Sequence, residues 1–221
     1  MMLTPISMAA LPAALDRLAA GLGAEEPRWV LSRIARPIEA ERAIGCRAVE
    51  HWWRAIDIIG EYDMDTRPGS PALDFSWNGE VLRNGTEAYV LLHEVAHYQI
   101  AEPARRRMID FGLGAGPETG DREAADAAAC LFGIAREREE AMASLLGILW
   151  ELELGQPALA SFLDQNWLEG PGAASHFETI LFGLRESGFV DADFRPTPRL
   201  HHEPYAAARD YSFTAPVKLD T

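Results

Sequence analysis

The sequence is short of cysteine, which limits the sites that sulfur could build. Its two cysteines, Cys46 and Cys130, are far apart and fit neither a CxxC motif nor the spacing of a zinc ribbon. Both lie in apolar stretches with helical periodicity, where a plain buried thiol is the common use of cysteine. We therefore expect two buried free thiols, as is typical of a protein in a reducing cytoplasm.

Basic residues are also scarce. The 20 lysines and arginines stand against 34 aspartates and glutamates, a formal net charge of −14. A field of this sign repels nucleic-acid backbones and anionic membrane surfaces, so we expect the protein to bind neither. The sequence does not predict an oligomeric state.

Long apolar runs are missing as well. No window approaches the roughly 20 continuous apolar residues that a membrane span needs. The N-terminal stretch 1–27 lacks the basic start of a signal peptide, and Pro12, Asp16 and Arg17 interrupt its apolar residues. We interpret it as part of the mature chain and expect a cytoplasmic protein.

The length and composition indicate one ordinary globular domain. A chain of 221 residues with 48% hydrophobic and 24% charged residues can bury a substantial core. It contains no internal repeat and no low-complexity tract. We expect a single domain over 1–221, with an irregular, proline-rich C-terminal tail over 189–221.

Most of the chain carries apolar residues at helical spacing. This pattern predicts two helices in the first part of the chain, over 8–22 and Pro37–Ile59. A third helix is expected from an N-cap at Thr86 to Ala101, and Pro103 opens a short fourth one. Further helical regions are expected over Arg122–Gly155, which is continuous, Pro157–Trp167 and Ala173–Ser187. The run Ala72–Trp77 predicts one or two short strands, ending at an Asn78-Gly79 turn. The expected class is α+β, predominantly α-helical.

Two histidines four residues apart indicate a metal site. His93 and His97 project from the same face of the expected helix, so both imidazoles can reach one ion. Glu94 stands beside them, placed to hold a proton without ligating the metal, which completes an H-E-x-x-H pattern. The apolar flanks, residues 90–92 and 95–96, bury the helix, and buried histidines need partners.

A third ligand is needed, because catalytic metal sites generally combine three protein ligands with an open position. The segment Arg136–Gly147 is the best source. Glu140 shares a helical face with the small residues Ala143, Ser144 and Gly147, which permit close approach of two helices. Glu137 and Glu139 are the alternatives. Two histidines and one carboxylate serve both zinc hydrolases and non-haem iron oxygenases, so the ligands alone leave the reaction open.

The stretch "HEVAHYQIAEPARRRMIDFG", residues 93–112, resembles the bacterial elongation factor P hydroxylase family. That family carries H-E-x-x-H followed by an aromatic residue, then I-A, A-R-R and D-F-G. The matching positions are His93, Glu94, His97, Tyr98, Ile100-Ala101, Ala104-Arg105-Arg106 and Asp110-Phe111-Gly112. A Pro-acidic-Gly loop and a helix with an essential glutamate follow in the family; here Pro117-Glu118 and Gly120-Asp121-Arg122 resemble the loop, and Glu139 or Glu140 occupies the glutamate's neighbourhood.

The resemblance implies a metal-dependent oxygenase with one divalent ion, Fe(II) in preference to Zn(II). Its substrate would be a protein, elongation factor P or a similar one, hydroxylated on its modified lysine. Under this reading His93, His97 and Glu140 hold the ion, and Glu94 orients or deprotonates a bound ligand. We expect a zincin-like domain.

A second reading is a zinc-dependent, metallopeptidase-like hydrolase. The chain departs from the hydroxylase pattern after Gly112, where Leu113-Gly114-Ala115-Gly116 replaces aromatic residues, and the stretch "EEAMASLL" resembles the glutamate helix of compact zinc peptidases. In such an enzyme Glu94 is the general base that takes a proton from metal-bound water. A binding module that keeps the constellation without turnover is the third reading.

Other residues have structural predictions. Arg105, Arg106 and Arg107 are expected on the surface of their short helix. We expect His51, Trp52 and Trp53 to pack in the core, and the adjacent pair His201-His202 to lie at the surface. Tyr98 is expected to pack close to the metal site.

Overall fold

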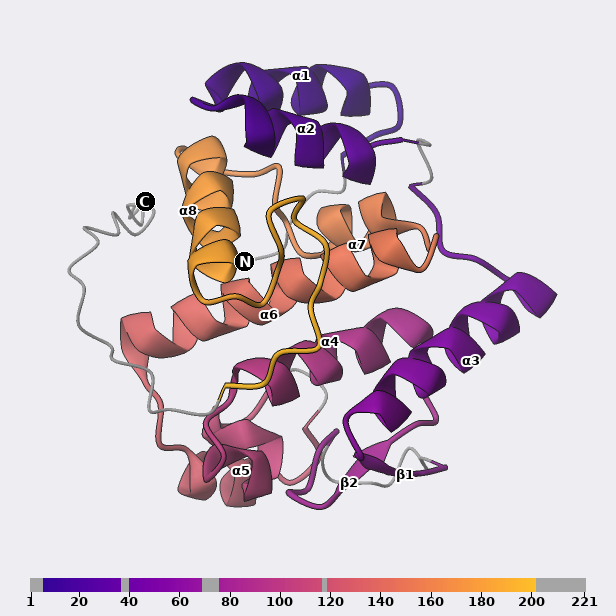
Figure 1. Ribbon diagram of the computed structural model, residues 1–221, viewed down its shortest axis with the longest axis vertical. Coiled ribbons are helices and arrows are strands. Elements are labelled where there is room, and N and C mark those ends of the chain that lie inside the picture. The colour runs from indigo at the N-terminus through magenta and orange to yellow at the C-terminus, as the bar shows by residue number, and fades with distance from the viewer. Residues whose placement is uncertain (1–5, 37–39, 69–75, 117–118, 202–221) are drawn as a thin grey trace.

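The computed structural model describes residues 6–36, 40–68, 76–116 and 119–201 (Figure 1). The described residues form eight α-helices, two 3-10 helices and a two-stranded sheet. In chain order these are α1 (Leu11–Gly21), α2 (Glu25–Ile34), α3 (Gly45–Glu61), β1 (Asp65–Arg67), β2 (Val81–Arg83), α4 (Ala88–Ile100), η1 (Arg105–Arg107), η2 (Ile109–Gly112), α5 (Arg122–Ala128), α6 (Gly133–Glu153), α7 (Ala158–Asp164) and α8 (Ala173–Glu186). The predicted helical α+β class is confirmed.

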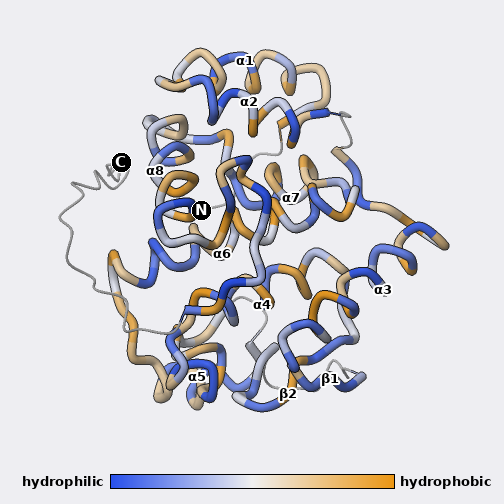
Figure 2. Tube along the Cα trace, in the orientation of Figure 1, coloured by the Kyte–Doolittle hydropathy of each residue, from blue (hydrophilic) through white to orange (hydrophobic). Residues whose placement is uncertain are grey.

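Helices α4 and α6 lie side by side at the centre of the molecule (Figure 1). Helix α3 covers the other side of α4, whereas α7 and α8 pack on α6 and the pair α1–α2 lies over α8. Leu91, Leu92 and Val95 of α4 are fully buried, and the hydropathy colouring shows apolar residues along both central helices (Figure 2). A helix that is apolar on most of its circumference belongs in a core.

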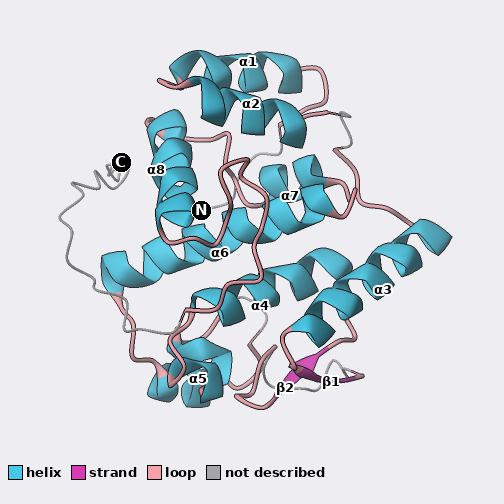
Figure 3. Cartoon of the chain, viewed as in Figure 1, coloured by secondary structure: helices cyan, strands magenta, loops and turns pink. Residues whose placement is uncertain are grey.

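The sheet is small and differs from the predicted strands. β1 and β2 pair in parallel, with Asp65 opposite Val81 and Arg67 opposite Arg83 (Figure 3). Of the expected strand Ala72–Trp77, residues 72–75 lie outside the described residues, and Trp77 forms an isolated bridge with Leu82. The turn at Asn78-Gly79 is confirmed: the Asn78 side chain accepts the backbone N–H groups of Glu80 and Val81.

Several helix limits differ from prediction. Helix α2 was not anticipated as a separate element, α3 begins at Gly45 rather than Pro37, and α4 begins at Ala88, with Glu87 rather than Thr86 as its N-cap residue. The region predicted as one helix from Arg122 is divided into α5 and α6. The division arises because the N–H groups of Cys130 and Leu131 bond the carbonyl of Gly112 instead of continuing the helix.

The side chains of both cysteines are exposed, so the prediction of buried thiols was wrong. Cys46 lies in the first turn of α3, and Cys130 in the link between α5 and α6, neither of which is covered by the core. His51 is buried as predicted, whereas Trp53 is 57% exposed, so its prediction was wrong: Trp53 lies on the face of α3 opposite to that of the buried His51 and Ala55.

The chain after α8 is irregular up to residue 201, as predicted, and residues 202–221, His202 included, lie outside the described residues. Phe189 and Phe194 are buried, and the Gln99 side chain donates to the carbonyls of Thr197 and Arg199, at 2.8 and 3.0 Å. This segment is therefore fastened across α4. Among the described residues, no helix combines the length and the apolar character that crossing a membrane requires.

Candidate metal centre

His93, His97 and Glu140 come together between α4 and α6. The Nε2 atoms of the two histidines are 3.0 Å apart, and the His97 Nε2 lies 3.4 Å from the Glu140 Oε2. All three ligand atoms lie within 4.8 Å of one another, which makes this the cluster within the described residues that could hold a metal ion. These are the three residues that the sequence predicted as ligands.

The spacing fits a shared ion. Two ligands bound about 2.0–2.1 Å from one ion are roughly 3–3.4 Å apart at octahedral to tetrahedral angles. Two of the three separations, 3.0 and 3.4 Å, fall in this range, and the third, between His93 and Glu140, is within 4.8 Å. The Nε2 atoms face the cluster, whereas the Nδ1 atoms of His93 and His97 are buried and lack a hydrogen-bond partner among the described residues. Two imidazoles and one carboxylate form a set that suits iron(II) or zinc.

The helix contact that builds this cluster centres on Gly147. A Cβ atom there would lie 3.2 Å from the His93 Cα and 3.4 Å from the His93 backbone nitrogen, tighter than ordinary packing. The two helices run in opposite directions at this point, so Glu140, two turns before Gly147, lies level with His97 rather than His93. The predicted use of small residues for close helix approach is confirmed at Gly147.

The two competing glutamates have other environments. Glu139 is buried and forms a two-pronged ion pair with Arg105, in which Nη1 lies 3.0 Å from Oε1 and Nη2 donates to Oε2. Glu137 is exposed, and no ion pair or hydrogen bond to the two histidines is seen for it among the described residues. Of the three candidate carboxylates, the Glu140 group is therefore the one beside the histidines.

The expected surface position of the arginines was wrong for two of the three. Arg105 and Arg106 are 8% and 9% exposed, while Arg107 is exposed. Arg106 donates to the carbonyls of Tyr98 and His201, at 2.8 and 2.6 Å. The predicted short helix is replaced by two 3-10 turns that bring both guanidinium groups inward, where carboxylate and carbonyl oxygens satisfy them.

Burial and mutual charge shift the pKa values of the three candidate ligands. Burial, reinforced by the charge of His97, lowers the pKa of His93 to about 3, although Glu140 acts in the opposite direction. Burial also acts to lower the pKa of His97, but the hydrogen bond and charge of Glu140 outweigh it, so the pKa of His97 is raised. Burial would raise the pKa of Glu140, yet the hydrogen bond and charge of His97 bring that pKa down to about 2. The carboxylate is thus ionised and paired.

Glu94 has a different electrostatic environment from that of Glu140. Burial raises the pKa of Glu94 to about 7; the charges of Asp110 and Glu140 act in the same direction, and those of His97 and Arg83 oppose them. A carboxyl group with a pKa close to neutrality can both take and return a proton, which is the property required of a general acid or base. The catalytic role of Glu94 stays a prediction.

An aromatic layer beneath the cluster was not anticipated in detail. The Phe111 ring stacks on His97, with centroids 5.6 Å apart and planes at 20°, and its other neighbour is Trp77, at 5.7 Å and 4°. Tyr98 meets the edges of Trp77 and Tyr62 rather than the ligands themselves. The signal for this layer was the D-F-G triplet, whose Phe111 is the residue in contact with the ligand.

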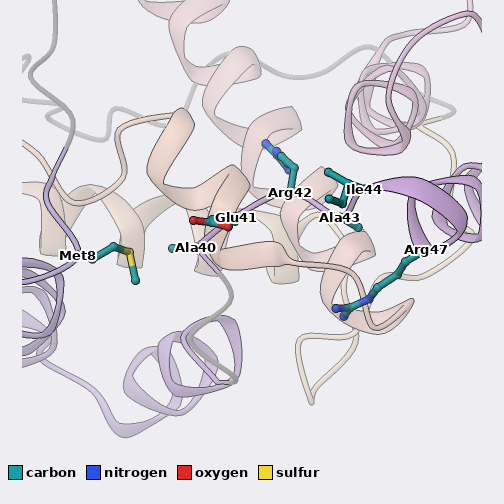
Figure 4. Close-up of a pocket in the computed structure, with 7 residues that line it drawn as sticks. All are labelled: Met8, Ala40, Glu41, Arg42, Ala43, Ile44 and Arg47. Atoms are coloured by element: carbon teal, nitrogen blue, oxygen red, sulfur yellow. The ribbon is translucent and has the colours of Figure 1, made fainter.

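The hollow drawn in Figure 4 lies away from this cluster. It has a volume of about 430 Å³ and is lined by Met8, by residues 40–44 and by Arg47 (Figure 4). Its Arg42 side chain reaches Glu151, eleven residues beyond Glu140 on α6, or about 16 Å along the helix axis. His176, stacked on Trp167, and His201 are likewise not part of the metal-ligand cluster.

No protein-family model, curated protein or solved structure matches this chain.

Proposed function

We propose that the protein is an Fe(II)-dependent protein hydroxylase with a zincin-like domain. The observation that carries the proposal is the 2-His-1-carboxylate cluster of His93, His97 and Glu140, whose ligand atoms lie within 4.8 Å of one another. This donor set with open positions is the arrangement used by non-haem iron oxygenases.

The surroundings of the cluster support this choice. The segment that resembles the elongation factor P hydroxylase family wraps around the ligands: Phe111 stacks on His97, and Arg105 pairs with Glu139, the neighbour of Glu140. The family motif therefore coincides with the packing around one site.

The substrate that the resemblance implies is the modified lysine of elongation factor P or a similar protein in the cytoplasm. Glu94, Asp110 and Glu140 contribute three carboxyl groups around the histidines, as their mutual charge effects indicate, and such an environment suits a cationic side chain. The Glu140 side chain is 41% exposed, so a substrate can approach the cluster from the side of Glu140.

With Fe(II) bound, the centre supplies activation of dioxygen: one oxygen atom enters a substrate C–H bond as a hydroxyl group and the other leaves as water. Two electrons from an external donor and two protons complete the balance. The protein's own share is to hold the ion through His93, His97 and Glu140 and to handle a proton at the Glu94 carboxylate.

A zinc-dependent hydrolase is the second candidate, favoured by the position of Glu94 directly after His93. A carboxylate in that position takes the proton of a metal-activated water during peptide hydrolysis. Such enzymes also align an extended substrate along a strand. The described strands, β1 and β2, are three residues long, which offers little length for this purpose and places the hydrolase second.

The test is the mass of the modified-lysine peptide of elongation factor P. It would be compared in cells with the gene, without it, and complemented with wild type or with Glu94→Gln. An added oxygen atom that depends on the gene and is missing with Glu94→Gln supports the proposal. An unmodified peptide in every strain would eliminate this substrate, and cleavage of a peptide library would then test the hydrolase.

A further inference from the structure

One buried side chain joins the segments that surround the metal ligands. Arg105 of η1 donates from Nη1 to the Glu139 Oε1 at 3.0 Å and to the Phe111 carbonyl at 3.1 Å, and from Nη2 to the Glu139 Oε2. The planar guanidinium thereby connects three elements, η1, η2 and α6. A fork with fixed geometry holds both partners in direction as well as distance.

Each segment that Arg105 contacts either carries a proposed metal ligand or packs against one. Glu139 immediately precedes Glu140, so fixing its carboxylate fixes the turn of α6 that presents the ligand. Phe111 carries the ring that stacks on His97. Metal-binding histidines are usually oriented by a hydrogen bond at the nitrogen that faces away from the metal. The His97 Nδ1 has no such partner among the described residues, so stacking on Phe111 takes over the orienting role.

The turn that carries Phe111 needs to be held. Asp110 and Phe111 have φ values of 43° and 55°, a left-handed conformation that side chains disfavour and that persists only when the surroundings enforce it. Three hydrogen bonds hold this turn. Arg105 donates to the Phe111 carbonyl, and the Asp110 N–H donates to the Trp77 carbonyl at 2.9 Å. The Thr119 hydroxyl donates to the Asp110 carboxylate at 2.9 Å.

We propose that Arg105 is a positioning residue of the metal centre. Through Glu139 it sets the place of Glu140, and through the Phe111 carbonyl it sets the orientation of the His97 ring. This inference depends on the metal centre of the proposed function, but not on the substrate or the reaction.

The experiment measures binding of Co²⁺ alone to the full chain, followed by the visible absorption of the bound ion. The main variant is the double substitution Arg105→Met with Glu139→Met, which removes both charges together and leaves no buried charge unpaired. It should fold, bind Co²⁺ about 10–100-fold more weakly than wild type and show an altered absorption spectrum. Arg105→Lys keeps the charge but loses the two-pronged guanidinium. Its Co²⁺ affinity should lie between those of wild type and the double variant.

Ser161→Ala is the matched control. It removes the hydroxyl that donates to the buried Glu151, in the part of α6 far from Glu140, and so weakens the same helix without touching the centre. Its Co²⁺ affinity and spectrum should equal those of wild type. An equal loss in Ser161→Ala would show that general destabilisation is responsible and would overturn the inference.

A double variant with wild-type Co²⁺ affinity and spectrum would also overturn it. Should the double variant fail to fold, folded Arg105→Lys decides: weaker binding with a changed spectrum supports the role, and unchanged binding refutes it. Wild type that takes up no Co²⁺ would remove the metal centre itself. Wild type that binds Co²⁺ but leaves elongation factor P unmodified contradicts only the proposed hydroxylase.

Discussion

Glu139 and Glu140 are consecutive on α6, yet their carboxylates have different partners: Glu139 pairs with the buried Arg105, and Glu140 lies 3.4 Å from the Nε2 of His97. Neighbouring helical residues are separated by about 100° around the axis, so one can face the packed segment η1 while the other faces α4. Because of this difference in partners, Glu140 rather than Glu139 is the proposed third ligand, and specific expectations follow.

Replacing Glu140 by Gln should weaken metal binding by more than about 100-fold, because an amide supplies no charge to offset that of a divalent ion and even indirect partners of a ligand contribute 10–100-fold. Titration with Co²⁺ measures the effect. Glu137→Gln, at an exposed position of the same helix, is the control and should bind as wild type does. Equal affinities in the two variants would contradict the assignment of Glu140.

His97→Ala should abolish stoichiometric metal binding, since it removes the ligand whose Nε2 contacts both of the others. Metal content after purification, determined by elemental analysis, provides the measurement. His176→Ala is a suitable comparison because that ring stacks on Trp167 and belongs to a different part of the fold. Retained stoichiometric metal in His97→Ala would eliminate the site.

Glu94→Gln should keep the metal and lose turnover. The substitution preserves the size of the side chain but removes the group that carries the proton, so the two properties are expected to separate. Metal content and product formation would be measured on the same preparation. A fully active variant would exclude the proton-handling role of Glu94.

Gly147→Ala should destabilise the fold. A methyl group there would lie 3.2 Å from the His93 Cα, and overpacking of this kind costs about 1–3 kcal/mol, more than the roughly 1 kcal/mol gained from the helix propensity of alanine. Urea unfolding measures the net loss, and Co²⁺ binding should weaken with it. Gly60→Ala in α3 is the control: its new methyl group meets nothing within 4 Å, so it should not destabilise.

The stability should depend on pH through Glu151. Burial raises the pKa of Glu151 from 4.5 to about 7, although the hydrogen bond from Ser161 and the charge of Arg42 lower it and that of Asp164 raises it. The folded state therefore binds the proton more tightly, and between pH 4.5 and 7 this group's contribution declines as pH rises, by at most about 3 kcal/mol. Glu151→Gln should lack this decline when the free energy of unfolding, measured with urea, is compared at pH 5 and pH 8. The same change between the two pH values in wild type and in the variant would refute the assignment.

The sequence predicted the clustered residues His93, His97 and Glu140 better than the contacts that hold them in place. Helical spacing brought His93 and His97 together, and the small residues opposite them correctly indicated that α6 packs against α4. The pairing of Arg105 with Glu139 could not be foreseen, because periodicity assigns charged residues to the surface and carries no information about a partner 34 positions away.

The turn at Asp110-Phe111 escaped prediction for a related reason. Left-handed backbone is expected at glycine, and here two residues with side chains adopt it because tertiary contacts hold them. The parallel pairing of β1 with β2 is also non-local, and strands of three residues give too short a pattern to recognise.

The apolar anchoring of α4 has a consequence for how an ion would be acquired. Leu91, Leu92 and Val95 are fully buried, and such side chains contribute about 1.5–3 kcal/mol each whatever the histidines bind. Folding and loading are then separate events: a chelating agent should strip the ion without unfolding the chain, in contrast to a zinc finger. Because zinc binds such ligands more tightly than ferrous iron, the cell's relative supply of the two ions at the moment of loading would decide which one the finished protein carries.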